Sequence, residues 1–166
     1  MPSTAETAEK YFAAVGRQDL DTMAEVWGDG KPSRIIGLAE LTAPHGVTEW
    51  FGGMFAAFPD FALKVEQIVT EGNTAVVRWT AKATFDGTGT FEGFRPNGAK
   101  IDLEGIDIVE IEDGRIVSLV AALNGLDLAR QIGAVPPAGS MPDKAMAAAF
   151  NAKTAVTAKI RELKDR

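Results

Sequence analysis

The sequence contains no cysteine and only one histidine, His45, among its 166 residues. Without cysteine the chain cannot form a disulfide, use a thiolate nucleophile or bind a metal through sulfur. A single histidine is too few for the imidazole-rich ligand sets that zinc prefers. The sequence therefore predicts no metal site, and the absence of thiols suits a reducing compartment.

Positive charge is also scarce, because 17 Lys and Arg residues face 23 Asp and Glu residues and leave a formal charge of −6. A nucleic-acid backbone or an anionic membrane surface would repel such a chain. We therefore expect no nucleic-acid partner and no membrane association. A neutral or cationic small molecule is the kind of partner that this charge allows.

Long apolar runs and phosphate-binding loops are missing as well. No apolar run approaches the ~18 residues of a membrane helix, and residues 1–10 lack the basic and apolar regions of a secretory signal. Gly87, Gly89 and Gly93 lie between predicted strands and do not open a helix, so they form no nucleotide-binding loop. We expect a cytoplasmic protein that uses no cofactor.

The composition that remains is that of one globular domain, with 46% hydrophobic and 24% charged residues. Ser3 and Glu6 form a capping-box pattern, and apolar residues then recur at helical spacing. This spacing predicts helices over residues 4–16, around Met23 to Trp27, and over 47–58, where Pro59 ends the third helix.

Strand patterns follow these helices and are separated by turn signals that contain glycine or asparagine. They cover residues 34–37, 61–69, 74–85, 100–111 and 116–123. Helices followed by hairpin-linked strands indicate the α+β class. The loop between residue 37 and Pro44 is predicted to hold no strand.

The last strand leads into residues 127–132, after which several prolines interrupt the chain. Residues 144–164 are rich in alanine and predict an additional C-terminal helix. We therefore expect one domain over residues 1–134, with residues 135–166 as its proline-rich linker and helical extension.

Three groups of segments resemble a known family when they are taken in order. They are Tyr11-Phe12-Ala13-Ala14 with Gln18-Asp19-Leu20-Asp21, then Ala56-Ala57-Phe58-Pro59-Asp60-Phe61, then Gly105-Ile106-Asp107-Ile108 with Asp113-Gly114-Arg115-Ile116 and Arg130-Gln131-Ile132-Gly133. Over residues 4–134 the chain is similar to the SnoaL-like branch of the nuclear transport factor 2 (NTF2-like) superfamily.

The resemblance implies a cone, in which a strongly curved antiparallel or mixed sheet wraps around three N-terminal helices. It also implies a ligand pocket at the wide end and a homodimer that buries the open face of the sheet. Members of the superfamily include ketosteroid isomerase, polyketide cyclases, limonene epoxide hydrolase, dehydratases and non-catalytic binding proteins. The fold therefore leaves the function open, and the polar groups in the pocket must decide it.

Strand alternation indicates which side chains face that pocket. Trp79 and Phe85 share one face of their strand, and Leu103 and Asp107 share one face of the next. Asp107 is the single carboxyl group on an otherwise apolar inner row, so its pKa should be raised. A neutral carboxylic acid in this place can donate a hydrogen bond to a substrate oxygen.

The resemblance gives Asp107 and Tyr11 specific roles, because they match the oxyanion-hole aspartic acid and tyrosine of ketosteroid isomerase. The isomerase's general-base aspartate falls at Ile35 or Ile36, which cannot move a proton. This departure argues against steroid isomerisation by that mechanism.

Other members of the superfamily also lack their usual groups here. The strand histidine of the SnoaL-like cyclases falls at Phe85, and their closing-strand aspartate falls at Asn124. Residues 119–123 carry no charge, whereas the epoxide hydrolases need carboxylates and an arginine in their pocket.

Each candidate catalytic residue has a structural alternative. Asp107 could be a structural hydrogen-bond acceptor, and Tyr11 could pack its ring in the core while its hydroxyl bonds a structural partner. His45 could be a general base at the pocket mouth or a loop or N-cap residue of the third helix. Asn124 can orient a ligand but cannot act as a base.

We predict that aromatic and aliphatic side chains from several elements line the pocket together with these polar groups. The predicted ligand-binding residues are Asn124, Trp27, Trp50, Phe51, Phe55, Trp79, Phe85, Leu103 and Leu119.

These residues favour a SnoaL-like, cofactor-independent enzyme of the isomerase, cyclase or hydratase type that acts on a small apolar, oxygen-bearing molecule. The alternative is a non-catalytic NTF2-like protein that binds a small hydrophobic ligand, since the family's usual base is missing. A third possibility is a degenerate member that acts through its dimer surface, because Ile106 and Ile108 point outward from the sheet.

Overall fold

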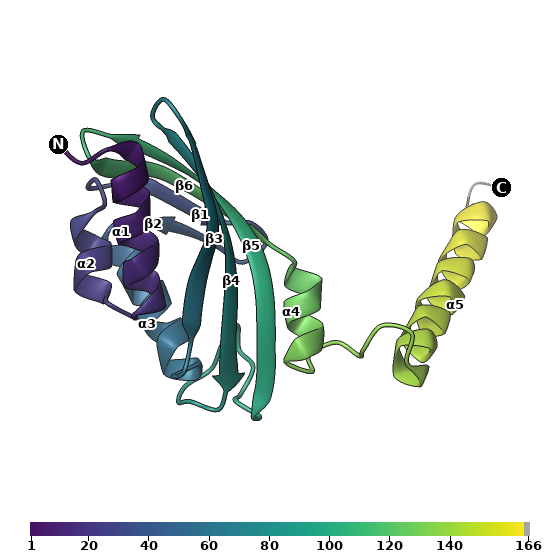
Figure 1. The fold of residues 1–166 in the computed structure, drawn as a ribbon. Coiled ribbons are helices and arrows are strands. Elements are labelled where there is room, and N and C mark those ends of the chain that lie inside the picture. The colour runs from purple at the N-terminus through teal and green to yellow at the C-terminus, as the bar shows by residue number, and fades with distance from the viewer. Residues whose placement is uncertain (165–166) are drawn as a thin grey trace.

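The computed structural model describes residues 1–164, which contain five helices and six strands (Figure 1). The helices are α1 (Thr4–Gly16), α2 (Leu20–Glu25), α3 (His45–Ala57), α4 (Gly125–Gln131) and α5 (Met141–Lys164). The strands are β1 (Pro32–Ile35), β2 (Ala39–Thr42), β3 (Ala62–Glu71), β4 (Thr74–Phe85), β5 (Ala99–Glu112) and β6 (Arg115–Leu123).

Helix α1 begins at the predicted residue because the capping box forms. The Ser3 hydroxyl accepts a hydrogen bond from the Glu6 backbone N–H at 3.2 Å, and a Glu6 carboxylate oxygen accepts one from the Ser3 N–H at 2.7 Å. Two N–H groups that the helix leaves unpaired are thereby satisfied. The buried side of α1 packs against β3.

The strands form one curved sheet in the order β2-β1-β6-β5-β4-β3. Only the pair of β1 with β6 is parallel, so the sheet is mixed, which is one of the two arrangements that the resemblance implies. Helices α1, α2 and α3 cover its concave face, and Figure 1 shows the long strands β3 to β6 curving around them. The α+β class is confirmed, and a curved sheet covers three N-terminal helices as the resemblance implies.

Burial along β4 and β5 alternates strictly from residue to residue. The predicted inner rows, Val77 to Phe85 and Ile101 to Ile111 in steps of two, are buried, while the intervening residues are exposed or half-buried. This alternation confirms the predicted parity and places Asp107 on the concave face.

One element differs from the sequence expectations, and a second was not predicted. Strand β2 lies within the segment expected to be a loop, because pairing with β1 organises four residues that are too short to show a reliable pattern. The segment after β6 is a helix, α4, and the Asn124 side chain accepts the backbone N–H of Asp127 at 3.0 Å to cap it.

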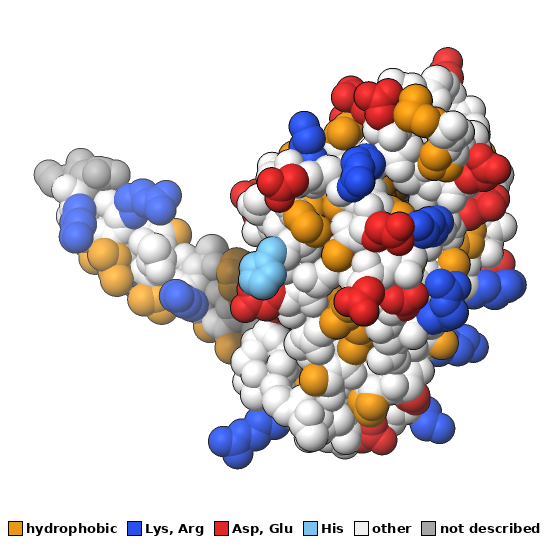
Figure 2. Space-filling model, turned by 90° about the vertical axis from the view of Figure 1, so that its left-hand side faces the viewer, with side chains coloured by type: hydrophobic (Ala, Val, Ile, Leu, Met, Phe, Trp, Pro, Cys, Tyr) orange, Lys and Arg blue, Asp and Glu red, His pale blue; other side chains and the backbone are white. Residues whose placement is uncertain are grey.

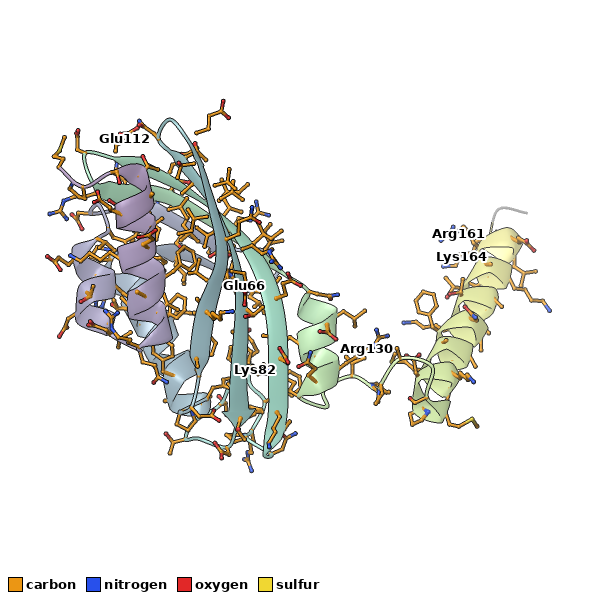
Figure 3. All side chains as sticks on the ribbon, in the orientation of Figure 1. Glu66, Lys82, Glu112, Arg130, Arg161 and Lys164 are labelled. Carbon is orange, nitrogen blue, oxygen red and sulfur yellow. The ribbon has the colours of Figure 1, made fainter. Side chains whose placement is uncertain are left out.

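Helix α5 stands apart from the domain, as Figure 1 shows. None of its residues is buried, and one ion pair, Arg130 Nη2 to Asp143 Oδ1 at 3.7 Å, ties its first turn to α4. Figure 3 labels Arg130 on this connection, with Arg161 and Lys164 near the far end of α5. Within residues 1–164, no helix has both the length and the apolarity that crossing a bilayer requires.

Candidate functional site

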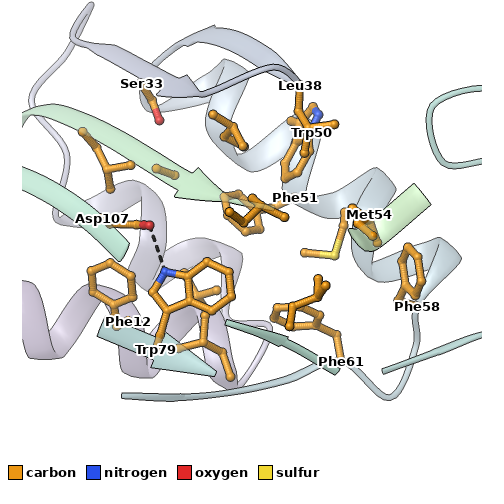
Figure 4. Close-up of a pocket in the computed structure, with 18 of the residues that line it drawn as sticks. Phe12, Ser33, Leu38, Trp50, Phe51, Met54, Phe58, Phe61, Trp79 and Asp107 are labelled. Carbon is orange, nitrogen blue, oxygen red and sulfur yellow. Dashed lines mark hydrogen bonds between the residues drawn. The ribbon is translucent and has the colours of Figure 1, made fainter. Parts of the chain in front are cut away.

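A cavity lies between the concave face of the sheet and helices α1 and α3 (Figure 4). Its volume is about 90 Å³, and its lining is almost entirely apolar. The lining residues are Tyr11, Phe12, Val15, Ser33, Ile35, Leu38, Trp50, Phe51, Met54, Phe58, Phe61, Leu63, Trp79, Phe91, Ile101, Leu103, Asp107, Leu119, Ala121, Leu123 and Leu128.

Asp107 reaches the cavity from the inner row of β5 and is only 6% exposed. The indole N–H of Trp79 donates a hydrogen bond to its Oδ1 at 2.8 Å, drawn as the dashed line in Figure 4. Burial raises the pKa of Asp107 from 3.8 to about 7, and the hydrogen bond from Trp79 acts against this rise. Near neutral pH the carboxyl group therefore exists in both protonation states.

Tyr11 reaches the same cavity from α1 and is also buried. Burial, and then the charge on Asp107, hold the pKa of the Tyr11 phenol well above its ordinary value. The phenol is consequently neutral at physiological pH and can donate a hydrogen bond. Its ring packs edge-on against Phe12 and Trp27, with centroids 5.3 Å and 6.0 Å away.

Ser33 is a third polar side chain at the cavity, and sequence reasoning missed it. It is 3% exposed and shares the inner face of β1 with Ile35. The predicted strand begins at residue 34, so Ser33 lies one residue outside it and strand alternation was not applied to it. In Figure 4 its hydroxyl is the polar atom on the side of the cavity formed by β1.

Comparison with known proteins agrees with this geometry. A family model described as SnoaL-like polyketide cyclase matches residues 5–132. The chain belongs to this family. A search of the curated proteins gave no match.

Comparison with solved structures confirms the NTF2-like fold. A putative SnoaL-like polyketide cyclase from Jannaschia sp. CCS1 is 24% identical with a TM-score of 0.71, covering 81% of this chain and 93% of its own. AclR, a putative hydroxylase from Streptomyces galilaeus, is 24% identical with a TM-score of 0.69, covering 80% and 97%. An LEH-like epoxide hydrolase from M. tuberculosis is 16% identical with a TM-score of 0.62, covering 78% of this chain and 88% of its own. At these identities the likeness shows the fold alone.

Within this SnoaL-like domain, Trp50, Phe51, Trp79, Leu103 and Leu119 line the cavity beside Asp107 and Tyr11. The structure thus brings seven of the predicted site residues together in one place. They come from both helices that face the cavity and from strands β4, β5 and β6.

His45 lies elsewhere, as the first residue of α3. It is exposed and borders an open groove with Glu40 and Glu49 on the outside of the domain. The single histidine, pale blue in Figure 2, is visible at the surface. This placement agrees with the structural alternative and puts His45 out of the cavity.

Four predicted ligand-binding residues do not line the cavity. Asn124 is exposed and caps α4, while Trp27 packs against Tyr11. Phe55 is buried beside Phe51, and Phe85 stacks on Phe58 with centroids 4.7 Å apart. Phe85 points inward as predicted, but neighbouring rings fill the space between its side chain and the cavity.

Phe91 is a lining residue that sequence analysis did not identify. It belongs to the connection between β4 and β5, where Gly89 and Gly93 have positive φ angles of 79° and 82°. The ring packs between Trp50 and Phe58, with centroid distances of 6.2 Å and 5.3 Å. The sequence signal that could have identified Phe91 is a large apolar residue within a glycine-rich connection.

Among residues 1–164, no three side chains of His, Cys, Asp or Glu are grouped so that they could hold a metal ion. Asp107 and Tyr11 are the titratable side chains in the cavity lining. The arrangement offers one group that can exchange a proton near neutral pH and one that can donate a hydrogen bond.

Proposed function

We propose that this SnoaL-like protein is a cofactor-independent enzyme of the isomerase, cyclase or hydratase type. Its substrate is a small apolar molecule that carries an oxygen atom, and Asp107 transfers the proton. The observation that carries the proposal is the single carboxyl group, with a pKa of about 7, on the wall of an apolar cavity. A general acid–base works best when its pKa is near the operating pH.

The positions of the other candidates support Asp107 as the base. His45 is outside the cavity, and the pKa of Tyr11 is too high for the phenol to act as a base. In this proposal Asp107, and not His45, is therefore the general base. Its carboxylate removes a proton from the carbon next to the substrate carbonyl, and its carboxylic acid returns that proton to a second atom.

Tyr11 supports this proton transfer through charge stabilisation. When the proton leaves carbon, negative charge moves onto the substrate oxygen. A neutral phenol in a water-poor cavity stabilises that charge by donating a hydrogen bond, and the low dielectric strengthens the effect. No electrons leave the substrate, so the reaction needs no redox cofactor.

The size of the cavity limits how the substrate enters. Pockets that bind drug-sized ligands have roughly 300–1,000 Å³, whereas this cavity has about 90 Å³. A substrate of more than a few heavy atoms must therefore displace side chains. Trp50, Phe51, Met54 and Phe91 are the lining residues that come from α3 and the glycine-rich connection.

The apolar lining also favours a second candidate function, the non-catalytic binding of a small hydrophobic ligand. The Asp107→Asn variant separates the two functions because asparagine keeps the shape and the acceptor for Trp79 but cannot transfer a proton. We expect turnover of enones or β-keto esters to fall about 10²- to 10⁴-fold, while binding of a hydrophobic fluorescent probe is retained.

The matched control is Asp102→Asn, which makes the same exchange on the exposed face of β5. Asp102 contacts Lys82 at the surface and should not affect turnover. Equal turnover in the wild type and in Asp107→Asn would contradict the enzymatic mechanism. Tight probe binding with no conversion of any compound by the wild type would favour the binding protein instead.

A further inference from the structure

Trp79 and Gly105 are direct partners in the pairing of β4 with β5, and Asp107 lies two residues further along the same face of β5. Neighbouring residues on one face of a strand are about 6.5 Å apart, which a long planar side chain can span. The Trp79 indole does so, since its N–H reaches Asp107 Oδ1 at 2.8 Å. Trp79 is 7% exposed, and the hydrogen bond is buried.

Gly105 provides the space that this arrangement needs. A Cβ atom at position 105 would stand 2.5 Å from Cε2 and 2.7 Å from Cη2 of the indole, and closer still to Cζ2. Separations this short do not occur between real side chains, so the indole lies directly over the Gly105 backbone. Any other residue there would push the ring away from Asp107.

We infer that Trp79 is a positioning residue that fixes the Asp107 carboxyl group. We also infer that Gly105 is needed because its missing side chain lets the Trp79 indole lie over the backbone of β5 and reach Asp107. Trp79 occupies Oδ1, and no group in residues 1–164 donates a hydrogen bond to Oδ2. The second oxygen is the one left for a substrate proton. The kinetic consequence of this inference rests on the proposed function, whereas its structural part does not.

The surroundings of Asp107 make the role of Trp79 measurable. Helix α1 contributes Tyr11, the only other titratable side chain in the cavity lining of the described chain. Strand β6 contributes Leu119 and Ala121, and β1 contributes Ser33 and Ile35, none of which carries charge. The Trp79 N–H is therefore the group that favours the ionised form of Asp107.

The first test is Trp79→Phe, which removes the donor and keeps an aromatic ring. We expect the pKa of Asp107 to rise by about one pH unit, since a hydrogen bond to a charged group is worth about 1.5 kcal/mol. Titration of the carboxyl carbon by NMR measures this directly and needs no substrate. In a plot of kcat against pH, the rising limb should shift to higher pH by the same amount, and KM should change less than kcat.

Trp50→Phe is the matched control, because Trp50 lines the same cavity and donates no hydrogen bond to Asp107. It should leave the pKa of Asp107 in place. An unchanged Asp107 pKa in Trp79→Phe, or an equal shift in Trp50→Phe, overturns the inference. A shift found only in Trp79→Phe, in a protein that converts no compound, supports the positioning role while the enzymatic proposal fails.

Gly105→Ala tests the second half of the inference. The new methyl group should displace the indole and raise the Asp107 pKa as Trp79→Phe does. If Gly105→Ala alone does not fold, the double variant Gly105→Ala/Trp79→Phe should fold, because the smaller ring removes the clash. The effects of the two substitutions on stability are then strongly non-additive.

Two outcomes contradict the role of the glycine. One is an unshifted Asp107 pKa in a folded Gly105→Ala variant, and the other is a double variant that is no more stable than Gly105→Ala.

Discussion

Burial of Asp107 has a free-energy cost that depends on pH. In the unfolded chain an aspartate ionises near pH 3.8, whereas in the folded protein its pKa is about 7 because the charged form is poorly solvated. Between these values the folded state retains a proton that the unfolded state has lost. The free energy of unfolding therefore falls as the pH rises from about 4 through 7.

This linkage predicts that Asp107→Asn is more stable than the wild type at pH 8, by up to about 4 kcal/mol. The difference should shrink toward zero near pH 4, where the wild-type carboxyl group is neutral in both states. Urea unfolding at the two pH values measures it. Asp102→Asn provides the comparison at an exposed site. If the free energies of unfolding of Asp107→Asn and the wild type differ by the same amount at every pH, the cost of burying Asp107 is ruled out.

Strand alternation predicts the position of some site residues but not of others. Asp107 was found from the sequence because an apolar row with one carboxyl group is conspicuous in a strand with strict period two. His45 is a candidate as the only histidine, next to the third helix, and Asn124 is one because the closing-strand aspartate of the SnoaL-like cyclases falls there. Their positions depend on where α3 and α4 begin, which places both side chains at exposed helix termini.

Among the elements, α5 differs from the rest because it contributes nothing to the core. Its larger apolar residues are exposed, and Phe150, Val156 and Leu163 are 69%, 60% and 64% exposed. Alanine and long polar residues give it high intrinsic helix propensity, which allows a helix of 24 residues without tertiary packing. Helix α4, in contrast, buries Leu128 beside the cavity.

Removal of residues 139–166 should therefore leave the thermal unfolding midpoint of the domain within about 2 °C of the full chain, since none of residues 139–164 belongs to the buried core. Removal from residue 125 onward should lower it substantially, because buried leucine and isoleucine side chains contribute about 1.5–3 kcal/mol each. Differential scanning calorimetry measures both. A large loss of stability in the shorter truncation would mean that α5 packs against the domain.

At the scale of the whole molecule, an apolar row crosses the outer face of the sheet. Val69, Val76, Ile108 and Val120 are consecutive cross-strand partners in β3, β4, β5 and β6. Val69, Val76 and Ile108 are 54%, 38% and 48% exposed. Charged side chains such as Glu66 and Lys82 stand on the same sheet (Figure 3). An apolar row of this kind on an open sheet face favours the homodimer that the family resemblance led us to expect.

We predict that the protein is a dimer at micromolar concentration and that Ile108→Glu makes it monomeric without unfolding it. A charge in the middle of the row would have to be buried unpaired in the dimer, which is costly. Light scattering coupled to size-exclusion chromatography reports the mass. Ala13→Glu, on the exposed side of α1, adds the same charge elsewhere and should remain dimeric; a monomeric wild type would contradict the prediction.

The α+β class, the starts and ends of α1 and β4, the inner rows of the sheet and the buried carboxyl group could all be predicted from the amino-acid sequence. These features depend on local spacing and capping, which are visible in a single stretch of chain. The folded chain was needed to show which inward residues meet at the cavity, that Trp79 binds Asp107 across Gly105, and that His45 and Asn124 lie outside. Those outcomes depend on how tightly rings from distant elements fill the concave face, and no local pattern encodes the volume that remains.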